Sequence, residues 1–284
     1  MTSWGAVLLV TDNMQLSLYA DPATLTGSRA TTWAPTAGPW SSWTPVPLPP
    51  GEQEGDYVYA GGIIDASDVL YLVDKRNRAV RAVQLSATGP GFVELPYSPY
   101  YFDPSVTFTV PETASLLLVP QASAATDQLW LPVAGSLLGV KGIAIVIATS
   151  YFRDQQYPPF FAPLPDGDCI WPEDFGSVAL PAGVVTEGTP GVLMLSSTEC
   201  GAVAFTADVT TGTTQKQYWT GTGYYSFAGE GEHAHPVYDA ASDSLLWVDY
   251  STRVGAPQQL CCVKLSTGFG SCDNWEGACA RARV

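Results

Sequence analysis

The chain has 284 residues, a hydrophobic content of 46% and a formal net charge of -15, with only 12 lysines and arginines in total. This hydrophobic content excludes a disordered chain and can supply the core of a large domain. The shortage of cations argues against nucleic acid and anionic membranes as partners, because both are bound through clustered positive charge. The longest apolar run, residues 137–148, is interrupted by Gly139, Lys141 and Gly142. It falls short of the roughly 18 residues that cross a bilayer, so we expect no membrane insertion.

The first predicted element is a β-hairpin near the start of the chain. Residues 5–32 contain an apolar run, an Asp-Asn turn and a second alternating run that ends at Asp-Pro. Alternation on both sides of a polar turn predicts two antiparallel strands. Residues 33–50 are rich in Pro and Trp, and proline cannot donate to a strand ladder. They are therefore predicted to form an edge strand or a surface loop.

A similar pattern returns further along the chain. Residues 62–89 and 236–268 both run from an apolar pair to Asp, a polar turn, an apolar run closed by Asp, a turn containing Arg, and a second run that ends near Gly. Residues 105–133 and 183–212 carry looser copies. A unit of this kind cannot cover its own apolar faces, so the copies are expected to stack against one another.

Three segments fall between these copies. Residues 95–104 form a connector rich in Pro and Tyr, after the second copy. Residues 142–149 are apolar and long enough for a strand, which is either the fourth strand of the third copy or the core of an additional unit. Residues 151–175 contain aromatics, prolines and acids without a periodic apolar face, a pattern that predicts a long loop.

Repeated strands without helical periodicity predict an all-β fold. Four strands per copy and five or six copies favour a β-propeller of five or six four-stranded blades, formed by residues 1–284 as a single domain. A β-sandwich is the alternative architecture, because sandwiches also consist of short strands but do not require an internal repeat.

The repeat also carries a loose family signature. The motif Asp-x-Leu-x-x-Val-Asp, followed by a run that reaches Leu-Ser and then Gly, occurs in residues 68–89 and 243–268. It resembles blades of the kelch and quinoprotein-like propeller superfamilies, and Gly61-Gly62 after Tyr-Val-Tyr-Ala is similar to the double glycine of kelch repeats. The resemblance covers most of the chain and implies a propeller fold. It implies no function, because propellers host many different ones.

The number and the surroundings of the cysteines indicate the redox state of the compartment in which the protein resides. An even number of cysteines in turn-like surroundings favours disulfides in an oxidising compartment, with free thiols as the alternative. The low charged content of 14% also favours an extracellular or cell-surface protein. The cysteines are Cys169, Cys200, Cys261, Cys262, Cys272 and Cys279.

The two histidines of the chain lie together in the acidic segment of residues 230–235. On an extended strand, His233 and His235 would project to the same face, and Asp239 follows one short turn later. Imidazole and carboxylate groups in that arrangement could bind a divalent metal ion, which is the only cofactor that the sequence suggests. A solvated acidic loop is the alternative interpretation.

A second hypothesis concerns glycoside hydrolysis, which needs two carboxyl groups facing each other across a cleft. Asp103 in Phe-Asp-Pro and Glu187 in Thr-Glu-Gly resemble segments of five-bladed glycosidases. The sequence departs from that pattern because Thr189 precedes Pro190 and Asp103 falls in the third copy. Both acids are also ordinary turn residues. The chain has no G-x-S-x-G element and no phosphate-binding loop.

Four aspartates recur at equivalent places in two copies: Asp65, Asp74, Asp239 and Asp249. A residue that returns within a repeat usually serves the repeat itself. We expect these carboxylates to accept backbone N–H groups in the turns between strands.

Aromatic residues in loops are the remaining candidates for function. Exposed rings interspersed with acids suit stacking on sugars or anchoring of a protein partner, although rings can equally fill gaps between blades. The sequence therefore favours a non-catalytic extracellular propeller that binds a protein or a glycan. An enzyme with its site in the central channel, a glycosidase or a metal-dependent hydrolase, is the alternative. The ligand-binding candidates are Trp40, Trp43, Tyr100, Tyr101 and Trp171.

Overall fold

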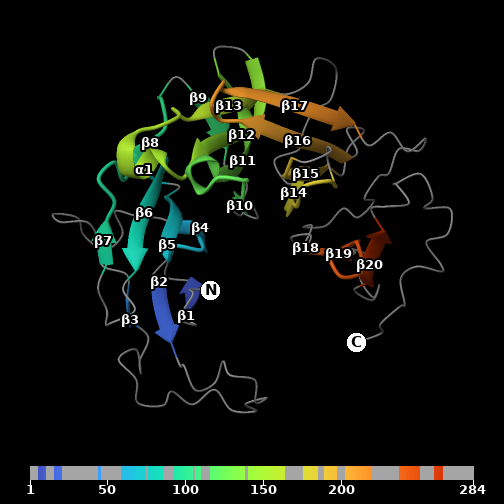
Figure 1. The fold of residues 1–284 in the computed structure, drawn as a ribbon, viewed down its shortest axis with the longest axis horizontal. Coiled ribbons are helices and arrows are strands. Elements are labelled where there is room, and N and C mark those ends of the chain that lie inside the picture. Colours follow the sequence, from blue (N-terminus) through green and yellow to red (C-terminus); the bar gives the residue numbers. More distant parts are fainter. Residues whose placement is uncertain are drawn as a thin grey trace. The chain divides into compact units, whose positions relative to one another are not determined.

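A computed structural model describes residues 6–10, 16–20, 44–45, 59–74, 76–85, 92–104, 106–109, 116–137, 140–163, 175–184, 189–196, 202–218, 237–249 and 259–264. In these residues the regular structure is almost entirely β-strand, in antiparallel sheets (Figure 1). The helical elements described are a 3-10 turn, Ala124–Thr126, and the single-turn helix α1, Tyr151–Asp154. No helix in the described segments is long and apolar enough to cross a membrane. The all-β prediction is confirmed.

The chain divides into two compact units. The first comprises Met1–Asp103 together with Phe152–Gln155. Its larger sheet has the order β4-β5-β6-β7, and β8 also pairs with β6. A smaller sheet has the order β1-β2-β3, and β1 lies next to β4. The strands are β1 (Ala6–Val10), β2 (Leu16–Ala20), β3 (Thr44–Pro45), β4 (Tyr59–Ile64), β5 (Val69–Asp74), β6 (Ala79–Leu85), β7 (Phe92–Glu94) and β8 (Tyr100–Tyr101).

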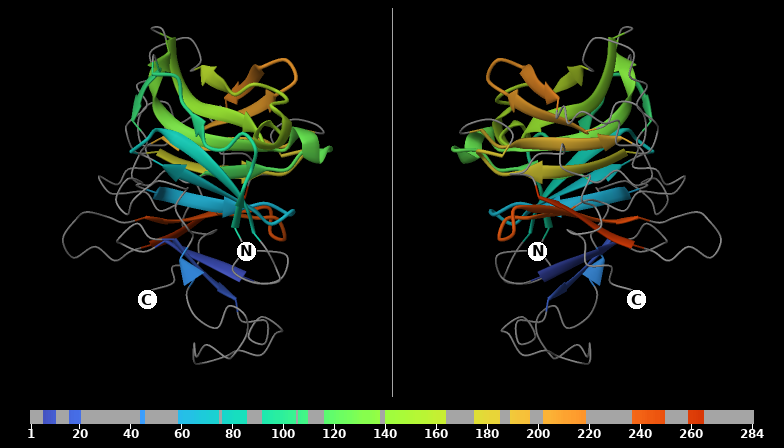
Figure 2. Two further views of the ribbon diagram at one scale, coloured as in Figure 1. Left: turned by 90° about the vertical axis from the view of Figure 1, so that its left-hand side faces the viewer. Right: turned by 90° about the vertical axis from the view of Figure 1, so that its right-hand side faces the viewer.

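The second unit comprises Pro104–Tyr151 and Gln156–Val284. Its sheets have the orders β10-β11-β12-β13, with β9 paired to β11, then β14-β15-β16-β17, and β18-β19-β20. The long β11–β12 hairpin curves strongly (Figure 2). The first strands of these sheets are neighbours, β10 beside β14 and β14 beside β18. The strands are β9 (Val106–Thr109), β10 (Leu117–Val119), β11 (Gln128–Leu137), β12 (Val140–Ala148), β13 (Phe160–Pro163), β14 (Phe175–Leu180), β15 (Gly191–Ser196), β16 (Ala202–Asp208), β17 (Thr213–Tyr218), β18 (Val237–Asp239), β19 (Ser244–Asp249) and β20 (Gln259–Lys264).

The central strands are buried on both faces. Every residue of β5 is buried, and so are residues 128–133 of β11 and 144–148 of β12. Side chains alternate between the two faces of a strand, so continuous burial means that both faces of the sheet are covered. The sequence already carries this feature, because these segments are continuous apolar runs and do not alternate with polar residues.

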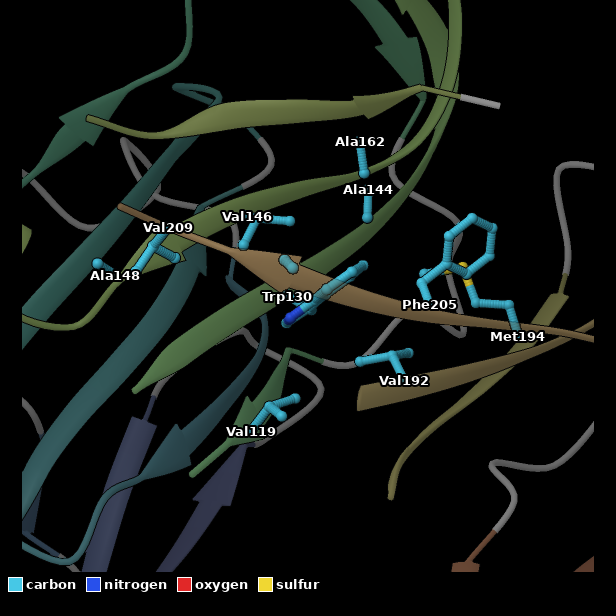
Figure 3. Packing of buried hydrophobic residues seen from close by; sticks show 11 residues of the cluster. Val119, Trp130, Ala144, Val146, Ala148, Ala162, Val192, Met194, Phe205 and Val209 are labelled. Atoms are coloured by element: carbon cyan, nitrogen blue, oxygen red, sulfur yellow. The ribbon is translucent and has the colours of Figure 1, made fainter. Parts of the chain in front are cut away.

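One core joins two sheets of the second unit. Trp130 of β11 lies at its centre, among side chains that come from β10–β13 on one side and from β15 and β16 on the other (Figure 3). The Trp130 indole is fully buried and donates through Nε1 to Gln128 Oε1 at 2.9 Å. Gln128 in turn donates through Nε2 to the Ala207 carbonyl at 2.7 Å. This pair of bonds satisfies the buried polar atoms and ties β11 to β16.

Three of the four recurrent aspartates act in turns, as predicted. Asp65 Oδ1 accepts the N–H groups of Ser67 and Val69 at 2.8 and 2.9 Å. Asp239 Oδ1 accepts the Ala241 N–H at 3.1 Å, in the equivalent turn before β19. Asp74 likewise accepts the N–H groups of its own turn after β5. The side chain of Asp249 lies outside the described part.

These turns share a second feature that the repeat alone did not reveal. The last residue of each, Asp68 and Asp243, has a left-handed backbone with φ of 61° and 50°. Aspartate tolerates this conformation better than most residues because its short side chain bonds locally. The two copies of the repeat therefore match in backbone conformation as well as in sequence.

The observed strands decide between two alternatives and correct one prediction. Residues 142–149 belong to the sheet of the third copy and begin no additional unit, because β12 pairs with β11 in a single sheet. The loop predicted for residues 151–175 is wrong, since this segment contains α1 and β13 and reaches the start of β14. β13 is an outer strand beside β12, a position in which a proline such as the terminal Pro163 is tolerated. The connector of residues 95–104 contains β8.

The bonds of Gln128 give a prediction about stability. Gln128→Ala removes the acceptor of a buried indole N–H and the donor to a buried carbonyl, and it leaves a small cavity. We expect a loss of about 2–4 kcal/mol in the free energy of unfolding, measured by urea denaturation. Gln215→Ala, at an exposed position of β17, is the matched control and should change it by less than about 0.5 kcal/mol. Equal effects of the two substitutions would contradict the proposed role of the bonds.

Candidate functional site

The candidate site lies along the outer side of β6 in the first unit. β7 pairs with β6 at residues 83–85 and β8 pairs with it at residues 79–80. Between these short strands the chain leaves the sheet, and the Ser98–Pro99 peptide bond in this stretch is cis. We refer to residues 93–103, which cover the last two residues of β7, this loop, β8 and the two residues after it, as the aromatic edge.

The backbone of the loop is held at each end and in the middle. The Leu95 N–H donates to the Ala82 carbonyl at 3.1 Å, and the Ser98 N–H donates to the Leu95 carbonyl at 3.0 Å. The Tyr97 N–H donates to the carbonyl of Phe152 at 3.1 Å. The intervening residues Pro96 and Pro99 have fixed φ angles and no N–H to satisfy. The loop is therefore constrained over its whole length.

Phe152 provides the anchor for Tyr97. Its side chain is fully buried and packs against the ring of Tyr71 in β5, with centroids 5.6 Å apart. The Tyr71 hydroxyl donates to Asp65 Oδ2 at 2.9 Å, which joins this contact to the turn before β5. The position of Tyr97 thus depends on the core of the first unit.

A polar network lies beneath the loop. Arg81 is buried in the middle of β6, and its Nε donates to Glu94 Oε2 at 2.8 Å. The Ser98 hydroxyl donates to the other oxygen, Glu94 Oε1, and accepts the Ala82 N–H at 2.7 Å. A buried guanidinium needs a carboxylate partner, since its desolvation is otherwise very costly. Ser98 couples this ion pair to the loop backbone.

The aromatic edge presents apolar side chains to solvent. Val93, Tyr97 and Tyr101 are 65%, 40% and 57% exposed, and the other large hydrophobic residue exposed in the described segments is Val237 of β18. Two other aromatic residues of the edge pack against each other. Phe102 is buried, and the ring of Tyr100 meets it edge-on with centroids 5.6 Å apart.

The charge of the edge is acidic. Asp103 is exposed at its end, directly after Phe102. Glu94 is half-buried and its two oxygens are engaged by Arg81 and Ser98. On a protein with a net charge of -15, such an edge repels anions and leaves neutral or cationic ligands as candidates.

Some of the predicted site residues fall on this edge. Tyr100, Tyr101 and Asp103 lie together on or beside β8. Asp239 lies in β18 of the second unit, where its carboxylate serves a turn. In the described residues, no group of three or more His, Cys, Asp or Glu side chains could hold a metal ion. The candidates outside the described residues are Trp40, Trp43, Trp171, Glu187, His233 and His235.

Sequence reasoning did not single out the residues that fix the edge. Arg81 was detectable as a lone cation within an apolar run, which implies a buried partner. Glu94 and Ser98 carried no such signal, because their roles depend on pairing across strands. Tyr97 was one of many aromatics in loops, and nothing in the sequence distinguishes its exposed ring from the buried ones.

No family model matches the chain, and no curated protein matches it. Among solved structures, it is similar to the crystal structure of TolB from Acinetobacter baumannii, with 10% identity and a TM-score of 0.32 over 93% of this chain and 66% of that chain. The chain thus spans just under two thirds of that protein's length. A likeness at this level carries no argument about function.

The network beneath the edge predicts a local change in hydrogen exchange. Ser98→Ala removes the acceptor of the Ala82 N–H, so this amide and that of Tyr97 should exchange faster in native conditions, because the loop opens more easily. Ser67→Ala, at an exposed turn position of the same sheet, is the control. Unchanged exchange at both amides in Ser98→Ala would show that the hydroxyl does not hold the loop.

Asp239 gives a prediction about pKa. The Ser242 hydroxyl and then the Ala241 N–H donate to its carboxylate and hold its pKa below the ordinary 3.8. The contribution of these bonds to the free energy of unfolding is fully present above the unfolded-state pKa of Asp239. It is lost as the pH falls through the folded-state pKa. We expect an NMR titration to give a pKa below 3.8 that rises in Ser242→Ala. An unchanged pKa in this variant would assign the shift to another cause.

Proposed function

We propose that the chain folds into a single β-propeller and acts as a non-catalytic, extracellular binding protein. It recognises a protein or a glycan through the aromatic edge of residues 93–103. Five sheets in the described residues favour the lower of the two predicted blade numbers.

Burial and strand order support a propeller. A two-sheet sandwich leaves one face of each sheet in solvent, whereas the central strands β5, β11 and β12 are covered on both faces. In the second unit three sheets follow in series, with their first strands β10, β14 and β18 as neighbours. Blades around an axis place their innermost strands in this way.

The distribution of exposed side chains supports binding at the edge. Three of the four large hydrophobic residues that are exposed in the described segments lie between residues 93 and 101. Exposed apolar residues that occur singly need no explanation, but a local concentration on a rigid segment marks an interaction site. This concentration is the observation that carries the proposal.

Each enzymatic alternative requires at least one residue outside the described part. Glycoside hydrolysis requires a second carboxyl group roughly 5–10 Å from Asp103, and Glu187 stays a prediction for that role. His233 and His235 likewise stay predictions for a divalent ion. Asp239 would join them only in competition with the turn bonds from Ala241 and Ser242.

The binding function is tested by a screen of glycans and extracellular proteins, followed by substitution. For any ligand found, Tyr97→Ala and Tyr101→Ala should each weaken binding by about 1–2 kcal/mol in calorimetry, because each removes an aromatic anchor. Val237→Ala, an equally exposed position in the second unit, should leave the affinity unchanged. Wild-type affinity in both tyrosine variants would place the site elsewhere. Turnover that is lost in Asp103→Asn would favour the enzyme instead.

A further inference from the structure

We infer that Phe152–Gln155 is a strap that docks reversibly on the first unit and fixes the aromatic edge while it is docked. When the strap is released, Tyr97 loses the hydrogen bond to Phe152, and the edge no longer holds its rings in one arrangement. The strap thus regulates the binding site proposed above, and its functional meaning rests on the proposed function. Its docking is measured without a ligand.

The path of the chain singles out the strap. Phe152–Gln155 belongs to the first unit, whereas the residues that precede and follow it along the chain belong to the second. The strap overlaps α1, which is a single helical turn. A helix this short is not stable alone, because one turn forms too few hydrogen bonds to offset the entropy cost of nucleation. The position of the strap therefore depends on the contacts that it makes within the first unit.

Phe152 provides the buried contact of the strap. Its ring is fully buried against Tyr71 of β5, and its carbonyl accepts the Tyr97 N–H at 3.1 Å. Residues 153–155 are exposed, so most of the apolar surface that the strap buries is that of one phenyl ring. This burial is a small part of what keeps a whole unit folded. The strap can therefore open while the sheet beneath it stays intact.

The backbone that leaves the strap is strained. Gln155 has a φ of 58°, and Tyr157, two residues further on, has a φ of 54°. This left-handed region is unfavourable for most residues other than glycine, because the Cβ atom crowds the backbone carbonyl. The docked chain keeps both residues in this region, and release of Phe152 lets them leave it. Burial of the ring favours docking and the backbone strain favours release, which gives the strap two accessible states.

Release of the strap acts directly on the aromatic edge. The Tyr97 N–H has its acceptor on Phe152, whereas the bonds of Ser98 to Leu95 and to Glu94 lie within the edge itself. The loop therefore loses its central support but keeps the bonds beside it, and the exposed ring of Tyr97 becomes free to move. A ligand that needs the docked position of Tyr97 favours docking of the strap in turn, because coupling between two equilibria is reciprocal.

Native-state hydrogen exchange of the whole chain, followed by NMR at low urea concentrations, tests the strap. The reference is the amide of Leu85, whose bond to the Asp68 carbonyl at 2.9 Å does not involve the strap. We expect the Tyr97 amide to be at least about tenfold less protected than the Leu85 amide, because opening of the strap needs less free energy than opening of the sheet. Its protection should also depend less on urea, because the opening exposes little surface.

Two substitutions should shift the docking equilibrium in opposite directions. Phe152→Ala removes the buried ring and should lower the protection of the Tyr97 amide about tenfold or more. Gln155→Gly relieves the left-handed strain at an exposed position and should raise this protection about threefold. Gln155→Ala is the matched control, because it removes the same exposed side chain but keeps a Cβ atom, and it should leave the protection unchanged. Gln155→Gly tests the strap independently of the cavity that Phe152→Ala creates.

Two results would overturn the strap. The first is equal protection and equal urea dependence of the Tyr97 and Leu85 amides, which means that Phe152 leaves its place only when the sheet opens. The second is protection of the Tyr97 amide that does not change in Gln155→Gly or that rises equally in Gln155→Ala. Either result leaves the binding function standing, because Tyr97→Ala and Tyr101→Ala test that function with a ligand. A screen that finds no ligand rejects the binding function and leaves the exchange results unaffected.

Discussion

The structure depends on central strands that are covered on both faces. Within β5, β11 and β12, each described side chain is buried, so any polar group there has to find its partner inside the protein. Gln128 does so by joining the Trp130 indole to the Ala207 carbonyl. Arg81 of β6 does so through Glu94 of β7. These two contacts differ in chemistry but satisfy the same requirement, one between sheets and the other at the edge of a sheet.

The requirement also explains where prolines are tolerated. Pro132 lies inside the long strand β11, where a missing N–H would normally break the ladder. Along β11 it falls after the segment that pairs with β10 and before the segment that pairs with β9. The register with β12 shifts directly after Pro132. At the aromatic edge, Pro96 and Pro99 likewise lie outside paired strand, in the loop between β7 and β8, which pair with two separate segments of β6.

Local features of the sequence predicted local features of the structure well. The aspartate turns could be found because the chemistry of Asp65 and Asp239 acts within a few residues, and a repeat makes such positions visible twice. The apolar runs of β5, β12 and β15 were equally clear. The polar outer strand β17 and the proline-flanked strand β13 had no periodic signal, since an outer strand needs only backbone bonds to one neighbour. The strands β13 and β17 are recognised only in the structure, where each pairs at the end of its sheet.

The candidate site was only half predictable for the same reason. Tyr100, Tyr101 and Asp103 stand out in the sequence as aromatics and an acid among prolines, but sequence alone does not tell an inward ring from an outward one. The structure separates them, with Tyr101 exposed in β8 and Phe102, the residue directly after this strand, buried. Alternation along β8 therefore assigns Tyr100 to packing and Tyr101 to the surface.

The position of the aromatic edge in the sheet accounts for the rigidity of its backbone and for its accessibility to ligands. An outer strand has one side free of strand pairing, which makes it accessible to ligands but also prone to pair with other chains. Here β7 and β8 are short and are separated by a loop with two prolines, so neither offers a continuous row of backbone groups. Side chains, and not the backbone, are then what the edge presents. Because Ser98, Glu94 and Phe152 hold that loop from the buried side, the exposed tyrosines stand on a support that belongs to the core of the first unit. The backbone of the edge is held by hydrogen bonds within the protein, whereas its tyrosine rings are exposed. This combination favours a ligand that contacts the side chains over a peptide that adds a strand to the sheet.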